Sequence, residues 1–343
     1  MKIEEDTKLD FGDVLIRPKR TTMSSRSEVD LERQFTFPHS TLKWKGVPII
    51  AANMDTIGTY EVYNVLSKHK IITAFHKFYN AEDFISMQGL GLDPNYFMVS
   101  SGIQESDLRR LISIMDSIYV KFICIDVANG YMEQLIEFCS KVRELYPEKI
   151  IVAGNVVTRE ITEELILRGK VDIVKIGIGP GSACLTRTQT GVGMPQLSAI
   201  MECADAAHGV NGYIIGDGGI TCPGDVSKGL GGGADFIMIG GQFSGHDENP
   251  GQIIEENGKQ YKMFYGMSSE TAMKTHFGKM DKYRSSEGRT VKIKYKGALE
   301  NTVLNYLGGI RSTCTYVNAH KIKNIPKCCT FVKVNKQLNT IYA

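Results

Sequence analysis

One stretch of the sequence, residues 172–196, combines residue types whose order predicts chemistry. A short apolar run passes into a loop with three glycines, and a single thiol, two hydroxyls and a cation follow. The residues concerned are Gly177, Gly179, Gly181, Cys184, Thr186, Arg187 and Thr188. A thiol on a glycine-rich loop among polar groups is typical of a covalent nucleophile. The alternative is a structural cysteine, because an isolated cysteine is more often inert than reactive.

Two further stretches offer groups that suit a phosphorylated ligand. Asp217 precedes Gly218 and Gly219 at the end of one apolar run, and Gly240 and Gly241 end another. Paired glycines let backbone N–H groups approach an anion closely, although close packing of a strand against a helix also needs glycine. Asp217 is predicted to bind ribose hydroxyls, with a loop-capping aspartate as the alternative.

A polar segment later in the chain adds a carboxylate and a cation. It reads Tyr283-Arg284-Ser285-Ser286-Glu287-Gly288. Arg284 could pair with a phosphate, since a guanidinium matches that geometry. A glutamate in such a segment is usually only solvated, so Glu287 becomes a candidate for chemistry only if the fold brings it to the thiol.

Composition and spacing exclude several other classes of site. The chain has 343 residues, of which 42% are hydrophobic and 23% charged, as in an ordinary globular protein. None of the eight cysteines forms a Cys-x-x-Cys pair. His76, His208 and His246 are not spaced as metal ligands, and His208 is expected near a helix end.

Location and partners follow from the same features. The N-terminus is not a signal peptide and no run is long enough to span a membrane, so a cytoplasmic location with free thiols is expected. Residues 289–343 are basic, with Glu300 as their one acidic residue. Because this segment lacks a dense Lys/Arg block, no nucleic-acid partner is expected.

The elements that must position these residues are short apolar runs separated by helical patterns. The runs cover residues 47–53, 71–76, 95–101, 121–127, 149–156, 172–179, 213–219 and 236–241. They do not alternate cleanly, as expected of parallel strands buried on both faces. Eight strand–helix units predict a (β/α)₈ TIM barrel, with an open doubly wound sheet as the alternative. In a barrel the strand ends meet at one mouth, so the candidate residues are expected to converge there.

Local patterns refine this picture. Residues 131–146 place apolar side chains on one helical stripe, and residues 221–232 start with Thr221 as the expected N-cap and Pro223 in the first turn. The GIGPGS loop has the spacing G-x-G-x-G and precedes a polar loop. It is therefore rejected as a dinucleotide-binding loop, which needs G-x-G-x-x-G and an amphipathic helix.

The barrel is expected to carry two additions within a single domain, residues 1–343. Residues 1–46 form an N-terminal arm with a weakly alternating edge strand at 25–37. Residues 242–297 form a lid after the eighth strand, with a hairpin whose Asn257-Gly258 pair predicts a type I′ turn. A long polar insertion at that place overhangs the barrel mouth. Residues 299–310 read as the final helix.

Several of these stretches resemble one family. GIGPGSACLTRTQTGVGMPQLSA, DGGITCPGD, GADFIMIGGQFSG, FYGMSSETAM and YRSSEGRTV are similar to the purine-nucleotide oxidoreductase family of IMP dehydrogenase and GMP reductase. The match runs from residue 10 to residue 316. No insertion the size of paired CBS modules lies between Ile71 and Lys121, and the lid resembles that of the reductase branch.

The resemblance implies an activity and a mechanism. The reductase branch uses NADPH to convert GMP to IMP and ammonia, in purine nucleotide interconversion and salvage. The resemblance gives Cys184 the role of nucleophile at C2 of guanine, forming a covalent thioimidate. It gives Thr186 and Glu287 the role of a proton relay to the leaving ammonia, because an amine leaves far more readily once protonated.

The resemblance also implies binding residues. For the nucleotide these are Asp217, Gly218, Gly219, Gly240, Gly241, Gly266, Met267, Ser268, Arg284, Ser285, Ser286 and Gly288. For NADPH they are Ser25, Arg26, Lys77, Asp126, Val127, Ala128, Ile178, Gly179, Met267, Tyr283, Arg284, Ser312, Thr313, Cys314 and Thr315. Ser25 and Arg26 are expected to reach a neighbour's cofactor, which implies a homotetramer. A K⁺ ion is expected at the Gly179, Gly181 and Cys184 carbonyls near Arg187.

One departure and three alternatives remain at this stage. Many relatives have Thr directly after the nucleophile, whereas this chain has Leu185, which affects only the expected packing of the loop. The alternatives are an IMP dehydrogenase without CBS modules, a nucleotide-binding barrel without turnover, and a flavin-dependent barrel. Cys328 and Cys329 have no expected role, and adjacent cysteines are expected to stay free thiols.

Overall fold

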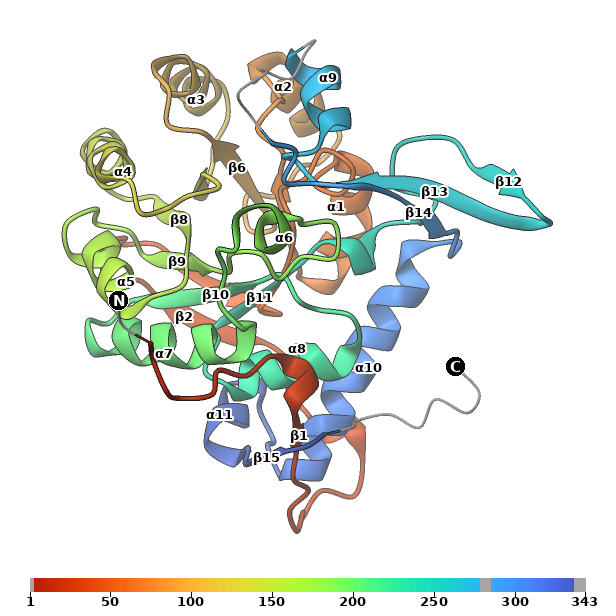
Figure 1. Ribbon diagram of the computed structural model, residues 1–343. Coiled ribbons are helices and arrows are strands. Elements are labelled where there is room, and N and C mark those ends of the chain that lie inside the picture. The colour runs from red at the N-terminus through yellow and green to blue at the C-terminus, as the bar shows by residue number, and fades with distance from the viewer. Residues whose placement is uncertain (1–2, 278–284, 336–343) are drawn as a thin grey trace.

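A closed barrel of eight parallel strands forms the centre of the computed structural model, which describes residues 3–277 and 285–335 (Figure 1). Each of the eight apolar runs supplies one strand, so the predicted TIM barrel is confirmed and the open sheet is excluded. The barrel strands are β4 (Ile49–Ala51), β5 (Ile72–Phe75), β6 (Phe97–Ser101), β7 (Phe122–Asp126), β8 (Ile150–Val156), β9 (Ile173–Ile176), β10 (Tyr213–Asp217) and β11 (Phe236–Ile239).

Helices follow the strands in turn and surround the barrel. They are α1 (Tyr60–Leu66), α2 (Ala81–Gly89), α3 (Glu105–Ser117), α4 (Glu133–Leu145), α5 (Arg159–Leu167), α7 (Gln196–Gly209), α8 (Pro223–Gly231) and α10 (Leu299–Val317). The short helices are α6 (Thr186–Thr190), α9 (Glu270–Phe277) and α11 (Ile325–Cys328). No helix in the described part of the chain is long and apolar enough to cross a membrane.

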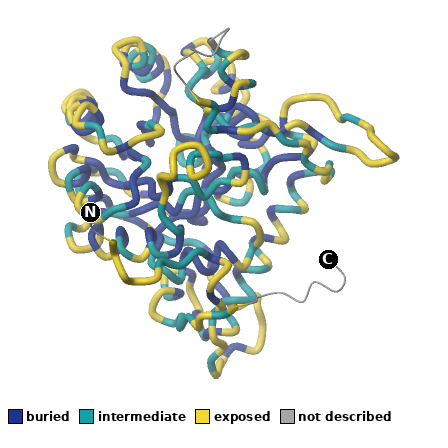
Figure 2. Tube along the Cα trace, viewed as in Figure 1, coloured by how far each residue is buried: buried dark blue, intermediate teal, exposed yellow. Residues whose placement is uncertain are grey.

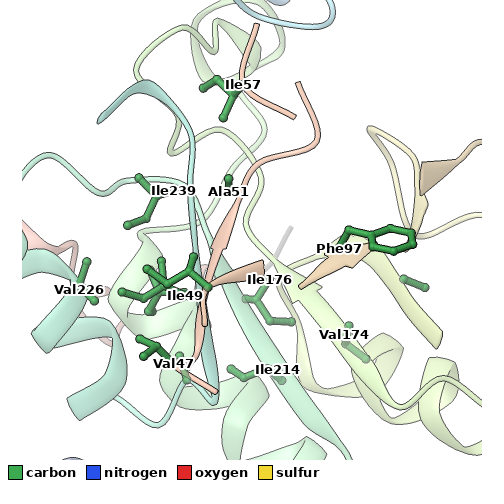
Figure 3. Packing of buried hydrophobic residues seen from close by; sticks show 14 of the residues in the cluster. Val47, Ile49, Ala51, Ile57, Phe97, Val174, Ile176, Ile214, Val226 and Ile239 are labelled. Atoms are coloured by element: carbon green, nitrogen blue, oxygen red, sulfur yellow. The ribbon is translucent and has the colours of Figure 1, made fainter. Parts of the chain in front are cut away.

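Alternation along the strands sorts their side chains into two layers. Ile49, Val174 and Ile176 face the helices and pack in the outer core (Figure 3). Ile50 and Ile173 instead belong to a second cluster inside the barrel. Burial therefore concentrates on the strands, while the outer faces of the helices are exposed (Figure 2). This alternation also decides which polar residues at the strand ends point inward.

The N-terminal arm closes the amino end of the barrel. Strands β2 (Arg33–Thr36) and β3 (Lys43–Gly46) pair antiparallel, and their rings enter the inner cluster. Phe35 stacks on Phe236 with ring centroids 4.4 Å apart. Arg33 binds Asp235, the residue before β11, at 2.7 Å. The predicted edge strand is therefore β2. The rings of β2 and β3 fill the amino end of the barrel, so the candidate site is expected at the carboxyl end.

Two other small sheets complete the fold. Strand β1 (Val14–Ile16) pairs with β15 (Phe331–Lys333). Strands β12 (Ile254–Glu256), β13 (Lys259–Tyr265) and β14 (Thr290–Lys294) form the lid sheet between β11 and α10. Its hairpin turn has Asn257 at φ 53° and Gly258 at φ 72°, as a type I′ turn requires. The hairpin tip projects from the body and is exposed (Figures 1 and 2).

Three local expectations need correction. The N-cap of α8 is Cys222 rather than Thr221, because Pro223 occupies the first helical position and fixes the preceding residue as the cap. The Thr221 hydroxyl instead donates to Asp225 Oδ2 at 2.6 Å. The residues after GIGPGS include the short helix α6, and the final helix continues to Val317 rather than ending at 310.

Candidate active site

A cavity of about 260 Å³ lies at the carboxyl end of the barrel, between the strand-end loops and the lid. Its lining brings together most of the predicted site residues, although they come from widely separated parts of the sequence. They are Asp126, Val127, Ala128, Ile178, Gly179, Gly181, Cys184, Thr186, Asp217, Gly218, Gly219, Gly240, Gly241, Gly266, Met267, Ser268, Glu287 and Gly288.

The thiol, hydroxyl and carboxylate form one hydrogen-bonded chain in this cavity. Cys184 Sγ lies 3.2 Å from Thr186 Oγ1, to which it donates. Thr186 Oγ1 in turn donates to Glu287 Oε2 at 2.7 Å. A single hydroxyl therefore connects the nucleophile to a carboxylate that comes from the lid. This arrangement can carry a proton in either direction between sulfur and carboxylate.

Backbone hydrogen bonds hold the cysteine loop against the lid. The Leu185 N–H donates to the Glu287 carbonyl at 2.6 Å, and the Arg289 N–H donates to the Ala183 carbonyl at 2.9 Å. The Arg289 side chain adds two bonds to the Ser182 carbonyl, at 2.7 Å from Nη2 and 3.0 Å from Nε. The lid segment that carries Glu287 thus pairs like a short strand with the loop that carries Cys184.

The other side of the cysteine loop rests on Arg187. Its guanidinium donates to the Met194 carbonyl at 2.6 Å and to Asp10 Oδ2 at 3.2 Å. Gly179 has φ +83°, and a Cβ there would lie 2.5 Å from Arg187 Cγ. Only glycine meets both conditions. The predicted glycine-rich cradle therefore curves around an arginine that also binds the N-terminal segment.

The predicted phosphate side is built from glycines after β10 and β11. Gly218 has φ +90°, and a Cβ there would lie 3.0 Å from Pro180. A Cβ on Gly241 would lie 2.8 Å from the Ser182 hydroxyl. These positions keep the backbone accessible from the cavity, which is what an anion bound by N–H groups requires.

The cavity lining also contains an ion cluster around the buried Lys175. Lys175 Nζ contacts Asp126 Oδ1 at 2.5 Å and Asp217 Oδ2 at 3.3 Å. Burial alone would lower the pKa of Lys175, but the two carboxylates outweigh burial and raise it. Burial alone would raise the pKa of Asp126, but the Lys175 ammonium lowers it. The floor of the cavity therefore holds a charged lysine and at least one ionised carboxylate.

Comparison with known proteins identifies the family. The family model described as "IMP dehydrogenase / GMP reductase domain" matches residues 8–339. This chain belongs to the IMP dehydrogenase/GMP reductase family. It is 56% identical over 343 residues to mouse GMP reductase 1, covering 99% of both chains. It is 56% identical to the GMP reductase of Klebsiella pneumoniae and 55% identical to human GMP reductase 1, each over 100% of this chain and 99% of the relative.

Some residues that the family resemblance predicted for the site lie elsewhere. Ser25 caps the 3-10 helix Arg26–Glu28, which packs on α10, and Ser312–Thr315 belong to α10 itself. None of these lines the cavity of its own chain. Lys77 is not in the lining either, but its charge lowers the pKa of Asp126.

Ser285 and Ser286 are the first lid residues that the structure describes after Phe277. Ser285 donates to Gln189 Oε1 at 3.1 Å, and Ser286 donates to the Gly288 carbonyl at 2.8 Å, so both support the lid and neither lines the cavity. Tyr283 and Arg284 lie outside the described residues.

Sequence reasoning missed three residues in this family member. Lys175 lies in the cavity floor, Asn155 donates to Asp217 Oδ2 at 2.8 Å, and Arg289 binds the cysteine loop. The available signal for Lys175 was a cation inside a strand that is otherwise apolar, since an unpaired buried lysine is very unfavourable. Asn155 and Arg289 gave no comparable signal, because polar residues at strand ends and in lids are common.

Proposed function

We propose that this protein is a GMP reductase, which uses NADPH to convert GMP irreversibly to IMP and ammonia. The hydrogen-bonded chain Cys184–Thr186–Glu287 is the observation that carries the proposal. It gives the cavity a nucleophile and a proton carrier, whereas a barrel that only binds nucleotides needs neither. The relatives named GMP reductase support the same choice.

The proton steps follow from the direction of the hydrogen bonds. Cys184 passes its proton through Thr186 Oγ1 to Glu287, and the thiolate attacks C2 of guanine. Glu287 then returns that proton through Thr186 to the amino group at C2, which departs as ammonia and leaves a thioimidate on Cys184. Once C2 has received a hydride, the C2–S bond breaks with its electron pair passing to sulfur, which releases IMP and restores the thiolate. The balanced reaction consumes GMP, NADPH and two protons, and yields IMP, NADP⁺ and ammonium.

The nicotinamide cofactor supplies the hydride that C2 receives. Residues suited to hold it are those that give the cavity an apolar wall, Val127, Ala128, Ile178 and Met267. Such a wall suits a flat ring, and Asp126 at its edge can accept from an amide group. We assign Lys77, Gly179 and Tyr283 to the same side, and Ser25, Arg26 and Ser312–Thr315 to a neighbouring subunit's cofactor in a homotetramer.

The remaining assignments concern GMP and K⁺. Asp217 holds the ribose, Gly218, Gly219, Gly240 and Gly241 hold the phosphate, and Gly266, Met267, Ser268, Arg284 and Gly288 cover the nucleotide. We assign a K⁺ ion to the carbonyls of Gly179, Gly181 and Cys184. Arg187 lies beside them, but its guanidinium already binds Asp10 and the Met194 carbonyl, so it does not take the place of the ion. The eight free cysteines support a cytoplasmic location.

A direct assay tests the proposal. The protein is mixed with GMP and NADPH, with and without K⁺, and both loss of reduced cofactor and release of ammonia are followed. We expect stoichiometric ammonia and oxidised cofactor, and no reaction with the Cys184→Ala variant. Reduction of NAD⁺ with IMP, in the absence of turnover with GMP, would instead identify an IMP dehydrogenase without CBS modules.

A further inference from the structure

Lys175 occupies a position where strand alternation places a side chain inside the barrel. Along β9, Val174 and Ile176 pack in the outer core, so Ile173 and Lys175 point inward. The Lys175 side chain is only 2% exposed. Gly154 on the neighbouring strand makes room for it, since a Cβ there would lie 2.6 Å from Lys175 Cβ. A charge at this depth requires a compensating set of partners.

Three oxygens around the ammonium provide that set. Nζ donates to Asp126 Oδ1 at 2.5 Å and to Asn53 Oδ1 at 3.3 Å, and it lies 3.3 Å from Asp217 Oδ2. Two of these contacts are hydrogen bonds, and the third, to Asp217, is an ion pair. The three oxygens come from the ends of β7 and β10 and from the loop after β4. The Lys175 side chain therefore contacts residues that follow or end three separate strands at the mouth of the barrel.

The same contacts orient Asp217. Asn155 also donates to Oδ2, at 2.8 Å, and Gln196 Nε2 donates to the Asp217 carbonyl at 3.1 Å. Among the described residues no hydrogen bond is made to Oδ1. Asp217 lines the cavity. The protein binds its Oδ2, and its Oδ1 remains available to a ligand.

We propose that Lys175 is a positioning residue that holds the Asp217 carboxylate for the ribose hydroxyls of the nucleotide and couples it to Asp126. The identity of the nucleotide rests on the proposed function. Without the ammonium, the two partly buried carboxylates would lose the cation that contacts both of them, and their repulsion would turn Asp217 away from its present position. The loss would therefore fall on the contact with ribose rather than on nucleotide binding as a whole.

Removal of the ribose hydroxyls from the ligand isolates this contact. Binding of GMP and of 2′,3′-dideoxy-GMP is measured by calorimetry for the wild type, for Lys175→Met and for Lys121→Met. Lys121 is a matched control, because it donates to Asn95 and to the Lys43 carbonyl at the closed end of the barrel. We expect the wild type to prefer GMP by about 10- to 100-fold, the range of a hydrogen bond to a charged group.

The variants should then separate. In Lys175→Met we expect the preference to fall below about threefold, mainly through weaker GMP binding, while Lys121→Met keeps the wild-type preference. A wild-type preference in a folded Lys175→Met protein would overturn the proposal, as would an equal loss of affinity for both ligands. If Lys175→Met does not fold, Lys175→Met/Asp126→Asn removes the repulsion between the two carboxylates. Because the ammonium that contacts Asp217 is still absent, the preference for GMP should stay below that of the wild type, and a wild-type preference would overturn the proposal.

The result is distinguishable from failure of the proposed function. If the wild type reduces GMP but Lys175→Met keeps its preference for the ribose hydroxyls, only the role of Lys175 is wrong. If the wild type neither binds nor reduces GMP, the proposed function is wrong, and with it the premise of this inference. Rescue of the preference in Lys175→Ala by ethylammonium, which can enter from the cavity, would further support a positioning role.

Discussion

The relay between sulfur and carboxylate depends on one hydroxyl, because Thr186 is the residue in the described part of the chain whose side chain bonds both Cys184 and Glu287. We expect Thr186→Val to lower kcat by about 100- to 1000-fold, within the range of general acid–base catalysis, and to leave the KM for GMP nearly unchanged. Thr186→Ser keeps the hydroxyl and should retain most of the activity. Steady-state kinetics with GMP and NADPH check both values, and a fully active Thr186→Val enzyme would exclude the relay.

Glu287 acts only through the same hydroxyl in this arrangement, which predicts non-additive losses. Glu287→Gln should lower kcat about as much as Thr186→Val, and the double variant should be no slower than either single variant. Independent contributions would multiply instead. A double variant that is slower by the product of the two single effects would show that Glu287 and Thr186 serve different steps.

At the scale of elements, the hydrogen bonds between the cysteine loop and the lid hold that loop in position. Arg289 donates twice to the Ser182 carbonyl, and its N–H binds the Ala183 carbonyl. Arg289→Met removes the side-chain bonds and leaves the backbone bond. We expect about a 30-fold loss in kcat/KM, since two bonds of about 1 kcal/mol each contribute about 2 kcal/mol at this exposed site. Faster amide hydrogen exchange over residues 182–186 would locate the effect, and unchanged exchange would contradict it.

The junction between the lid and α10 gives the molecule an acid-sensitive point. His246 is buried, its Nε2 bonds Thr302 Oγ1 at 2.7 Å, and within residues 3–277 and 285–335 its Nδ1 makes no hydrogen bond. Burial, with a smaller contribution from Lys296, lowers the pKa of His246 to about 4. The unfolded chain takes up this proton near the ordinary value of about 6.5, so stability is lost as the pH falls from there toward 4.

His246→Gln replaces the titrating imidazole with a group that takes up no proton in this pH range and can still bond Thr302. We expect wild-type stability to fall between pH 6.5 and 4 by up to about 3 kcal/mol more than that of the variant, from the size of the shift. Urea unfolding midpoints measured across this pH range provide the test. Parallel acid slopes for the two proteins would show that His246 is not buried in its neutral form.

The elements were predictable to different degrees for physical reasons. Buried parallel strands appear as short apolar runs, so all eight were found, and Asn257-Gly258 identified the hairpin because few other pairs adopt positive φ twice. Cys184 and Asp217 were found because their residue type and position at a strand end agree. Lys175 was missed because its partners, Asp126 and Asp217, are distant in sequence and meet only in the closed barrel.

At the scale of the whole molecule, the turn before Arg26 lies outside the cavity of its own chain, although the family resemblance gives Ser25 and Arg26 a place at a cofactor. Ser25 Oγ accepts the Ser27 N–H, and Glu28 Oε1 accepts the Ser24 and Ser25 N–H groups, so the turn before Arg26 is stabilised within itself. It packs on α10, where Arg311 donates to the Val29 carbonyl, and it does not line the cavity of its own chain. A preformed turn away from its own site is what a contribution to a neighbour's site requires.

Subunit mixing tests that arrangement directly. Arg26→Ala should raise the KM for NADPH, and Cys184→Ala should be inactive, because each removes a different half of a shared site. In hybrids co-expressed in equal amounts, half of the sites carry Cys184, and half of those receive Arg26 from a neighbour. Activity at limiting NADPH should therefore recover to about a quarter of the wild-type value in a closed homotetramer. Light scattering establishes the tetramer, and hybrids no more active than the mean of the two parents would restrict the arm to its own chain.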